Sequence, residues 1–363
     1  MDSSISLSPF SLNLRRHAAT PNMQLQSPRL KRIALGLAVL LPLTAAFAPR
    51  GTAITFAPKE GSSLTKTYNQ VLNAELAELS ISFNGEEMEM EEQPELSISS
   101  VEKIVLTDTY DAVDEGRATK LTRVFDELSR GRTQTFGDES DETEEVSELE
   151  GLTVLFTWDG EEETYTAAFQ EEDKDADKDL LADLFGDADM LGFLPTDEVE
   201  VDDTWSVELI DYRRLFSPSG ELVFMNEDGE SNKDEIDELL DDNLDGEIEC
   251  TFTGIEDVDG TQMAVIAFTI ELDSEAETSD ALEPPYGDMP PGTATRKITT
   301  ESEYEGTLYF NLAAGHISSA TIVGETSFTV EEGVDFELPD GETFSQVQTM
   351  VFDGEVEVDI TFE

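Results

Sequence analysis

The last eight residues of the chain read Val356-Glu357-Val358-Asp359-Ile360-Thr361-Phe362-Glu363. Apolar and polar side chains alternate strictly, which is the pattern of a β-strand with one buried and one solvent-exposed face. The pair Asp353-Gly354 comes just before this stretch, and such a pair favours the tight turn of a β-hairpin. The C-terminus is therefore predicted to be a strand that follows a hairpin turn at 353–354.

The same combination of alternating strands and turn residues recurs along the chain. Because short loops can join only antiparallel neighbours, it predicts antiparallel sheet rather than βαβ units. We expect a mainly β protein of the α+β class, with a hairpin-rich curved sheet or sheets and a few short helices. The other turns are predicted at Asn84-Gly85, Asp159-Gly160, Asp259-Gly260 and, more loosely, Ala314-Gly315-His316.

Few segments favour helix. Ser231 is a candidate N-cap for a helix over 233–240, and the apolar residues of 179–185 predict a second short helix. Residues 68–79 are rich in helix-forming residues, yet we predict a strand because the Asn-Gly turn follows directly. Acidic or proline-rich composition predicts loops in three stretches, 138–150, 171–179 and 273–295.

Residues 1–48 differ in kind from the rest. Five basic residues precede or flank an apolar run, Ile33–Leu43, and small residues follow it up to Ala48. This is the pattern of a secretory signal peptide, cut after Ala46 or Ala48, and the run is short for a membrane span of ~30 Å. We expect export to the periplasm or the exterior. The start is Met1 or Met23. The mature chain is predicted to form two β-rich units, 49–200 and 201–363, with one continuous domain as the alternative.

The charge balance excludes some partners. The 363 residues include 83 Asp or Glu against 21 Lys or Arg, which gives a net charge of −62. Such a surface repels nucleic acid and anionic membrane. It remains stable where salt screens the repulsion, so it indicates a saline exterior, with cation binding as the alternative.

Catalytic motifs are absent from the sequence. The single cysteine, Cys250, excludes a disulfide framework and a thiolate zinc site. His17 lies in the leader, and His316 is expected in an exposed turn. No Gly-x-Ser-x-Gly, His-Glu-x-x-His or phosphate-binding glycine loop occurs. We therefore expect a binding or structural protein without a required cofactor, with a hydrolase as an alternative that no motif supports.

One segment resembles a calcium loop. Asp241, Asn243 and Asp245 occupy positions one, three and five, and Gly246 occupies position six, as in an EF-hand. Phe252 stands at position twelve, so Glu247 and Glu249 would supply the remaining carboxylates. The alternative is an Asp-rich turn between a helix and a strand.

A further stretch carries a family resemblance. Leu194-Pro195, Val199 and Asp202-Asp203-Thr204-Trp205 resemble the "LP…V..GDTW" segment of uncharacterised exported acidic bacterial proteins, with Asp202 in place of their glycine. The stretch 305–317 resembles their closing hairpin. By distant analogy these proteins are similar to lipoprotein-carrier half-barrels, a curved sheet over helices that holds an acyl chain. The resemblance implies an alternative function, a periplasmic carrier of an apolar or lipid-like ligand, and implies no catalytic residue.

The calcium loop yields a first prediction. Millimolar calcium should stabilise the protein beyond matched ionic strength, by about 1.4 kcal/mol at a tenfold excess over the dissociation constant. Replacing Asp241→Asn together with Asp245→Asn should abolish this increment in thermal melts. A double variant that responds to calcium like the parent would reduce the effect to diffuse screening.

Overall fold

The computed structural model describes residues 51–363, apart from 89, 91–92, 115, 172, 221, 227–228, 230–242, 283–291 and 338–342. The described residues belong to one compact unit that starts at Gly51. The expected signal peptide and the predicted helix at 233–240 lie outside them. Strands from both expected β-rich units, 49–200 and 201–363, belong to a single sheet.

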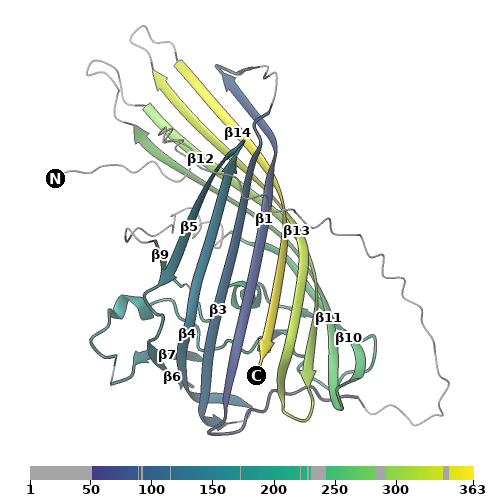
Figure 1. Cartoon of the computed structure of the whole chain (residues 1–363). Helices are drawn as coiled ribbons and strands as arrows, with labels where there is room; N and C mark the ends of the chain where they lie inside the picture. The colour runs from purple at the N-terminus through teal and green to yellow at the C-terminus, as the bar shows by residue number, and fades with distance from the viewer. Residues whose placement is uncertain are drawn as a thin grey trace. The chain divides into compact units, whose positions relative to one another are not determined.

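Fourteen strands form this one antiparallel sheet, which is curved and open (Figure 1). The predicted mainly β, antiparallel fold is confirmed. The strands are β1 Ser63–Phe83, β2 Glu86–Glu87, β3 Leu96–Asp114, β4 Arg117–Phe136, β5 Glu139–Ser147, β6 Thr153–Asp159, β7 Thr164–Phe169, β8 Thr204–Val207, β9 Phe224–Met225, β10 Asp245–Val258, β11 Thr261–Leu282, β12 Gly292–Asn311, β13 His316–Glu337 and β14 Thr343–Phe362. The described helices are the short 3₁₀ turns η1 Lys178–Leu181 and η2 Leu191–Phe193 and the α-helix α1 Leu209–Phe216.

The strand order is β7-β6-β4-β3-β1-β14-β13-β12-β11-β10-β8. Most neighbours in space are neighbours in sequence, as expected for successive hairpins. The pairs β4–β6, β1–β3 and β8–β10 each skip one strand of the sequence. The long-range exception is the central pair, in which β1 runs antiparallel to β14, so that Tyr68 lies opposite Ile360. The first and last described strands therefore join the two halves of the sheet (Figure 1).

The predicted hairpin turns are largely confirmed. Asn84-Gly85 and Asp259-Gly260 each form two-residue connections with positive φ at both positions. This backbone suits Asn-Gly and Asp-Gly because it matches the twist of the strands. Asp159-Gly160 also opens a hairpin, with a wider loop that ends at Thr164. The loop before His316 joins β12 to β13. Residues 68–79 form part of β1, as predicted.

The turn predicted at Asp353-Gly354 is wrong. Both residues lie inside β14, where Gly354 pairs with Ala74 of β1 and Thr326 of β13. A Cβ on Gly354 would lie 3.2 Å from the carbonyl oxygen of Asn73 and 3.2 Å from Cγ2 of Thr326. Glycine is present here because neighbouring strands come close, which is the other common reason for glycine within a strand.

One of the predicted loops is wrong as well, and another is wrong in part. Stretch 138–150 contains β5. Stretch 273–295 contains the end of β11 and the start of β12, while its proline-rich part, 283–291, lies outside the described residues. Their acidic residues alternate with small residues such as Ser274 and Ala276, which are buried. These acidic strands pair their backbones on the sheet, and most of their carboxylates are exposed; Glu145 of β5 is buried, 4.0 Å from Arg130. The third stretch, 171–179, is irregular up to η1.

The helix predicted at 179–185 is only the 3₁₀ turn η1, while α1 at 209–216 was not predicted. The segments η1, η2 and α1 supply side chains to the main core on the buried face of the sheet. Phe193 of η2, for example, packs edge-on against Phe268 of β11, with ring centroids 5.1 Å apart. A second, smaller core surrounds Phe352 and Met350 farther along the strands.

The opposite face of the sheet carries rows of carboxylates. Five glutamates on five adjacent strands lie directly opposite one another, and we call them the glutamate row. An adjacent row aligns Asp245, Asp273 and Glu301. Like charges directly opposite each other destabilise a sheet. The members of the glutamate row, all exposed, are Glu247, Glu271, Glu303, Glu325 and Glu355.

The glutamate row predicts how salt affects stability. Glu303→Gln removes the charge between Glu271 and Glu325, so it should stabilise the protein by roughly 0.2–1 kcal/mol at low ionic strength. Glu148→Gln, which removes an exposed charge outside the row, should change stability by less than about 0.5 kcal/mol. Thermal melts in increasing sodium chloride should rise for the parent, and the advantage of Glu303→Gln should vanish near 1 M salt, where the Debye length is ~3 Å. A parent melting temperature that is flat or falls with salt would contradict the saline-exterior interpretation.

Candidate functional site

Four charged side chains are buried together under the sheet, and we call them the buried ion network: Lys66, Asp108, Arg123 and Asp189. Lys66 lies 2.6 Å from Asp108 and 2.8 Å from Asp189. Arg123 binds both oxygens of Asp108 with its Nε and Nη2 atoms, each at 2.7 Å. Side-chain exposure is 0% for Lys66, Asp108 and Arg123 and 6% for Asp189. Two positive and two negative charges therefore balance in the interior.

The buried ion network fixes the segment 185–190 against the sheet. Arg123 donates to the carbonyl oxygens of Phe185, at 2.8 Å, and Gly186, at 3.0 Å. Tyr68 donates to the carbonyl oxygen of Ala188 at 2.7 Å, and Tyr110 donates to Asp189 at 2.6 Å. An irregular segment needs such partners because its backbone groups lack a sheet or helix to pair with.

The protonation states follow from this pairing. Burial alone would raise the pKa of Asp108, but the charges of Arg123 and Lys66 hold it below its ordinary value. Burial and the charge of Asp189 raise the pKa values of Tyr68 and Tyr110, so both phenols stay protonated and act as donors. Two cations therefore hold Asp108 in its ionised form, and each charged group of the network has an opposite charge within 2.8 Å.

A cavity of about 320 Å³ adjoins the segment 185–190. Its volume falls in the usual range for small-ligand sites, roughly 300–1,000 Å³. We call it the arginine–aromatic pocket. The hairpin β6–β7, the start of β4, the segment 184–191 and α1 together form its wall. The lining residues are Arg117, Trp158, Glu163, Thr164, Tyr165, Leu184, Phe185, Gly186, Asp187, Leu191 and Arg214.

Arg117 and the aromatic residues form one side of this pocket. The guanidinium of Arg117 stacks over Trp158, 3.9 Å from the ring centroid. Tyr165 meets Trp158 edge-on at 5.0 Å and donates to the carbonyl oxygen of Ala118 at 2.6 Å. Arg117 makes no ion pair within 4 Å with any described residue. Arg117 is exposed, and its guanidinium is oriented by the stacking contact with Trp158.

Asp187 and Arg214 also line the pocket. Burial, and then the charge of Asp189, raise the pKa of Asp187 to about 6. Arg214 of α1 donates from Nη1 to Asp211 at 2.8 Å, while its buried Nε atom has no hydrogen-bond partner. A buried donor without an acceptor is costly, and a bound anion or water would satisfy it. The pocket thus combines two guanidinium groups, an aromatic wall and a carboxyl group that titrates near pH 6.

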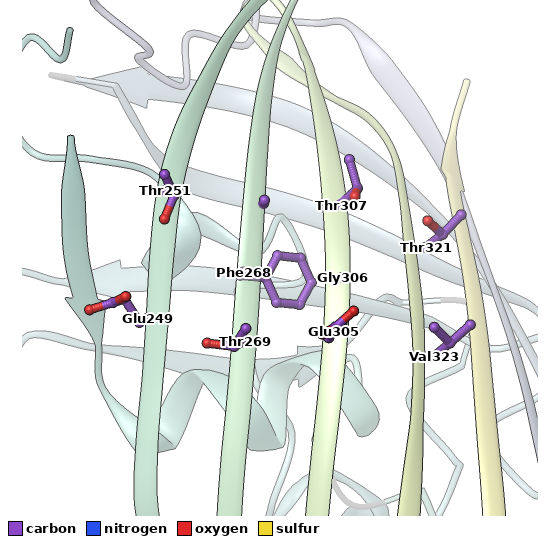
Figure 2. A pocket seen from close by; sticks show the side chains of 10 residues that line it. Glu249, Thr251, Phe268, Thr269, Glu305, Gly306, Thr307, Thr321 and Val323 are labelled. Carbon is purple, nitrogen blue, oxygen red and sulfur yellow. The ribbon is translucent and has the colours of Figure 1, made fainter. Parts of the chain in front are cut away.

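Two other hollows lie over the carboxylate-bearing surface of the sheet. One crosses β10–β13 at Gly306, where the ring of Phe268 lies against the glycine and Glu249, Thr307 and Val323 surround it (Figure 2). The other, of about 850 Å³, is lined by carboxylates such as Glu303 and Glu355. Neither brings cations and aromatic rings together as the arginine–aromatic pocket does.

The residues predicted to bind calcium are only partly described. Asp241 lies outside the described residues, and Asn243 lies in a turn just before β10. Asp245, Glu247 and Glu249 lie on β10 at alternate, exposed positions. In the described part of the chain, no three His, Cys, Asp or Glu side chains form a group suited to a metal ion. The calcium site stays a prediction.

Sequence reasoning did not identify the buried ion network or the pocket. Lys66 and Arg123 stand at inward positions, each flanked at i±2 by buried apolar residues. A basic residue at a position of a strand where the alternation calls for an apolar one is therefore the sequence feature that could have identified the network. Cys250 is buried in β10, where burial raises the pKa of its thiol to about 12, consistent with a core residue.

Comparisons with known proteins give no family. No protein-family model matches the chain, and no curated protein matches it. A solved structure described as "Asymmetric conductivity of engineered proteins" aligns with 82% of this chain and 100% of its own, at 8% identity and a TM-score of 0.16. The toluene transporter TodX of P. putida aligns with 84% of this chain and 90% of its own, at 7% identity and a TM-score of 0.12. Scores this low carry no argument about function. Among the described helices, none has the length and apolar character needed to cross a bilayer.

The buried ion network predicts a large effect for one substitution. Asp108→Asn leaves Lys66 and Arg123 buried against a single carboxylate, so it should destabilise the protein by about 3–5 kcal/mol. Glu127→Gln breaks the half-exposed pair with Lys103 and should cost at most about 1 kcal/mol. Urea unfolding at pH 7 measures both. Equal effects of the two variants would show that the network does not hold the fold together.

The same carboxylate sets a pH dependence. Because the folded-state pKa of Asp108 lies below its unfolded value, its contribution is complete above the unfolded pKa and disappears as pH falls through the folded one. Asp108→Asn should therefore lose less stability than the parent on acidification.

Proposed function

We propose that this protein is an exported, acidic binding protein, not an enzyme, that holds a small ligand in the arginine–aromatic pocket. The observation that carries the proposal is the composition of this pocket. Arg117 and Arg214 line it in a chain with four times as many acidic as basic residues, and each has donor groups without a carboxylate partner. Ligand sites commonly combine apolar walls with a few unpaired polar groups in this way.

The rigid surroundings of the pocket support binding. The buried ion network fixes the segment 185–190 from behind, while Tyr165 anchors the hairpin β6–β7 to Ala118. Gly186 lies so close to the ring of Tyr165 that a Cβ there would overlap it. Walls held in place before binding reduce the entropy lost when a ligand is ordered. No group in the pocket forms a nucleophile–base pair, which favours binding over turnover.

A second candidate function is the carriage of an apolar ligand. Half-buried apolar residues pack around the smaller core near Phe352, including Leu79, Ile98 and Phe328. They lie on the strand portions beyond the core that η2 and α1 contact. This surface is the place where a fatty acyl chain would bind if the analogy to lipoprotein carriers holds.

Tryptophan fluorescence tests both candidates. In a Trp205→Phe background, Trp158 is the remaining tryptophan and reports on the pocket. A panel of small metabolites that includes sugars, carboxylates, phosphate and a fatty acid should contain a ligand that shifts Trp158 emission. Arg214→Gln should abolish the shift, and Arg213→Gln, the neighbour on α1 that does not line the pocket, should retain it.

The outcomes separate the two functions. If no compound changes Trp158 emission, the proposed pocket function is wrong. Fatty-acid binding that is unaffected by Arg214→Gln would support the apolar carrier instead.

A further inference from the structure

We infer that the arginine–aromatic pocket takes a small monocarboxylate and that Asp187 takes up a proton when the ligand binds. This inference rests on the proposed function and specifies its ligand class and its regulation. The argument concerns three groups that line one cavity, Arg117, Arg214 and Asp187.

The two arginines favour a ligand with a negative charge. Stacking on Trp158 covers one face of the Arg117 guanidinium and leaves its in-plane N–H groups for an acceptor. Arg214 retains a buried Nε–H without an acceptor. A planar guanidinium matches the two oxygens of a carboxylate and forms paired, charge-assisted hydrogen bonds with it.

The apolar side chains of the pocket favour a ligand whose remaining part is apolar. Trp158, Tyr165, Leu184 and Leu191 line the same cavity and would contact an aromatic or branched substituent. The two acidic residues of the pocket oppose a dianion such as phosphate more strongly than a monoanion. A compact monocarboxylate with an apolar body therefore fits better than a phosphate.

The protonation state of Asp187 affects how well a carboxylate binds in the pocket. When ionised, it repels a carboxylate in the same cavity; when protonated, it can donate a hydrogen bond to that carboxylate. Its side chain accepts from the backbone N–H of Asp189 at 2.8 Å, which holds it in place. The charged and titratable groups around it are Tyr68 from β1, Arg117 from β4, Glu163 from the β6–β7 loop, Tyr165 from β7, Arg214 from α1, and Asp189 and Lys66 of the buried ion network.

The sign of the pH dependence follows. Burial and Asp189 raise the pKa of Asp187 to about 6, so the free protein takes up this proton as the pH falls through 6. A bound anion raises this pKa further, because it favours the neutral carboxyl. By linkage, carboxylate affinity is greatest below pH 6 and falls as the pH rises.

The test uses sodium benzoate and inorganic phosphate as probes in isothermal titration calorimetry with the mature chain between pH 5 and pH 8. We expect the benzoate dissociation constant to rise at least about tenfold from pH 5 to pH 8. Titrations near pH 6.5 in two buffers of different ionisation enthalpy should show net proton uptake by the protein. Asp187→Asn should bind benzoate with little change across this range. Asp183→Asn, which removes an exposed charge just before the segment 184–191, should behave like the parent.

Each outcome is decisive. Benzoate binding without pH dependence or proton uptake overturns the role of Asp187 and leaves the pocket function intact. Tighter binding of phosphate than of benzoate overturns the ligand class. If Asp187→Asn does not fold, proton uptake by the parent decides the question alone. Failure of every compound to move Trp158 emission overturns the proposed function and this inference together.

Discussion

The pairing of Arg123 with Asp108 beneath the sheet is the interaction on which the rest of the architecture depends. A guanidinium at an inward position of β4 cannot reach water, so its five donors must all find acceptors inside the protein. Asp108 supplies two, and the carbonyl groups of Phe185 and Gly186 and the hydroxyl of Ser219 supply others. These demands bring an irregular segment onto the sheet in one position. Phe185 and Gly186, which Arg123 holds, also line the arginine–aromatic pocket.

The two faces of the sheet solve opposite electrostatic problems. In the buried ion network, two positive and two negative charges balance, because an unpaired buried charge costs several kcal/mol. On the exposed face, carboxylates lie side by side in rows with few cations between them. Water and salt make this arrangement tolerable, since screening reduces repulsion between exposed charges. The charges of the buried ion network are thus paired within the protein, whereas the carboxylates of the rows are exposed to water and salt.

Local chemistry allowed much of the fold to be predicted, and long-range contacts explain the errors. Asn84-Gly85 and Asp259-Gly260 are turns with positive φ at both residues. Asn, Asp and Gly tolerate this backbone conformation, so the residue types alone are enough to predict the turns. Asp353-Gly354 has the same composition, but its glycine lies inside a strand. A side chain there would crowd Asn73 and Thr326, which are remote in sequence. Likewise, β5 is a strand because β4 offers it a backbone partner, which composition alone does not reveal. The pocket could not be predicted, since it joins β4, β7, the segment 184–191 and α1. The alternation of the strands does place Lys66 and Arg123 at inward positions, and this feature of the sequence indicates buried charges beneath the sheet.

The excess of negative charge bears directly on how an anion could reach the arginine–aromatic pocket. At long range the protein repels anions, yet at physiological ionic strength the Debye length is only ~8 Å, so most of the surface charge is not felt inside a cavity. Within the pocket, the partly buried Arg214 lies beside apolar side chains, where its interactions are less screened than in water, while Arg117 is exposed. Protonation of Asp187 would leave Glu163 as the remaining carboxylate among the residues that line the pocket, while Arg214 keeps its ion pair with Asp211. Under the proposed function, the affinity for an anion would then depend more on the charged groups that line the pocket, Arg117, Arg214, Glu163 and Asp187, than on the net charge.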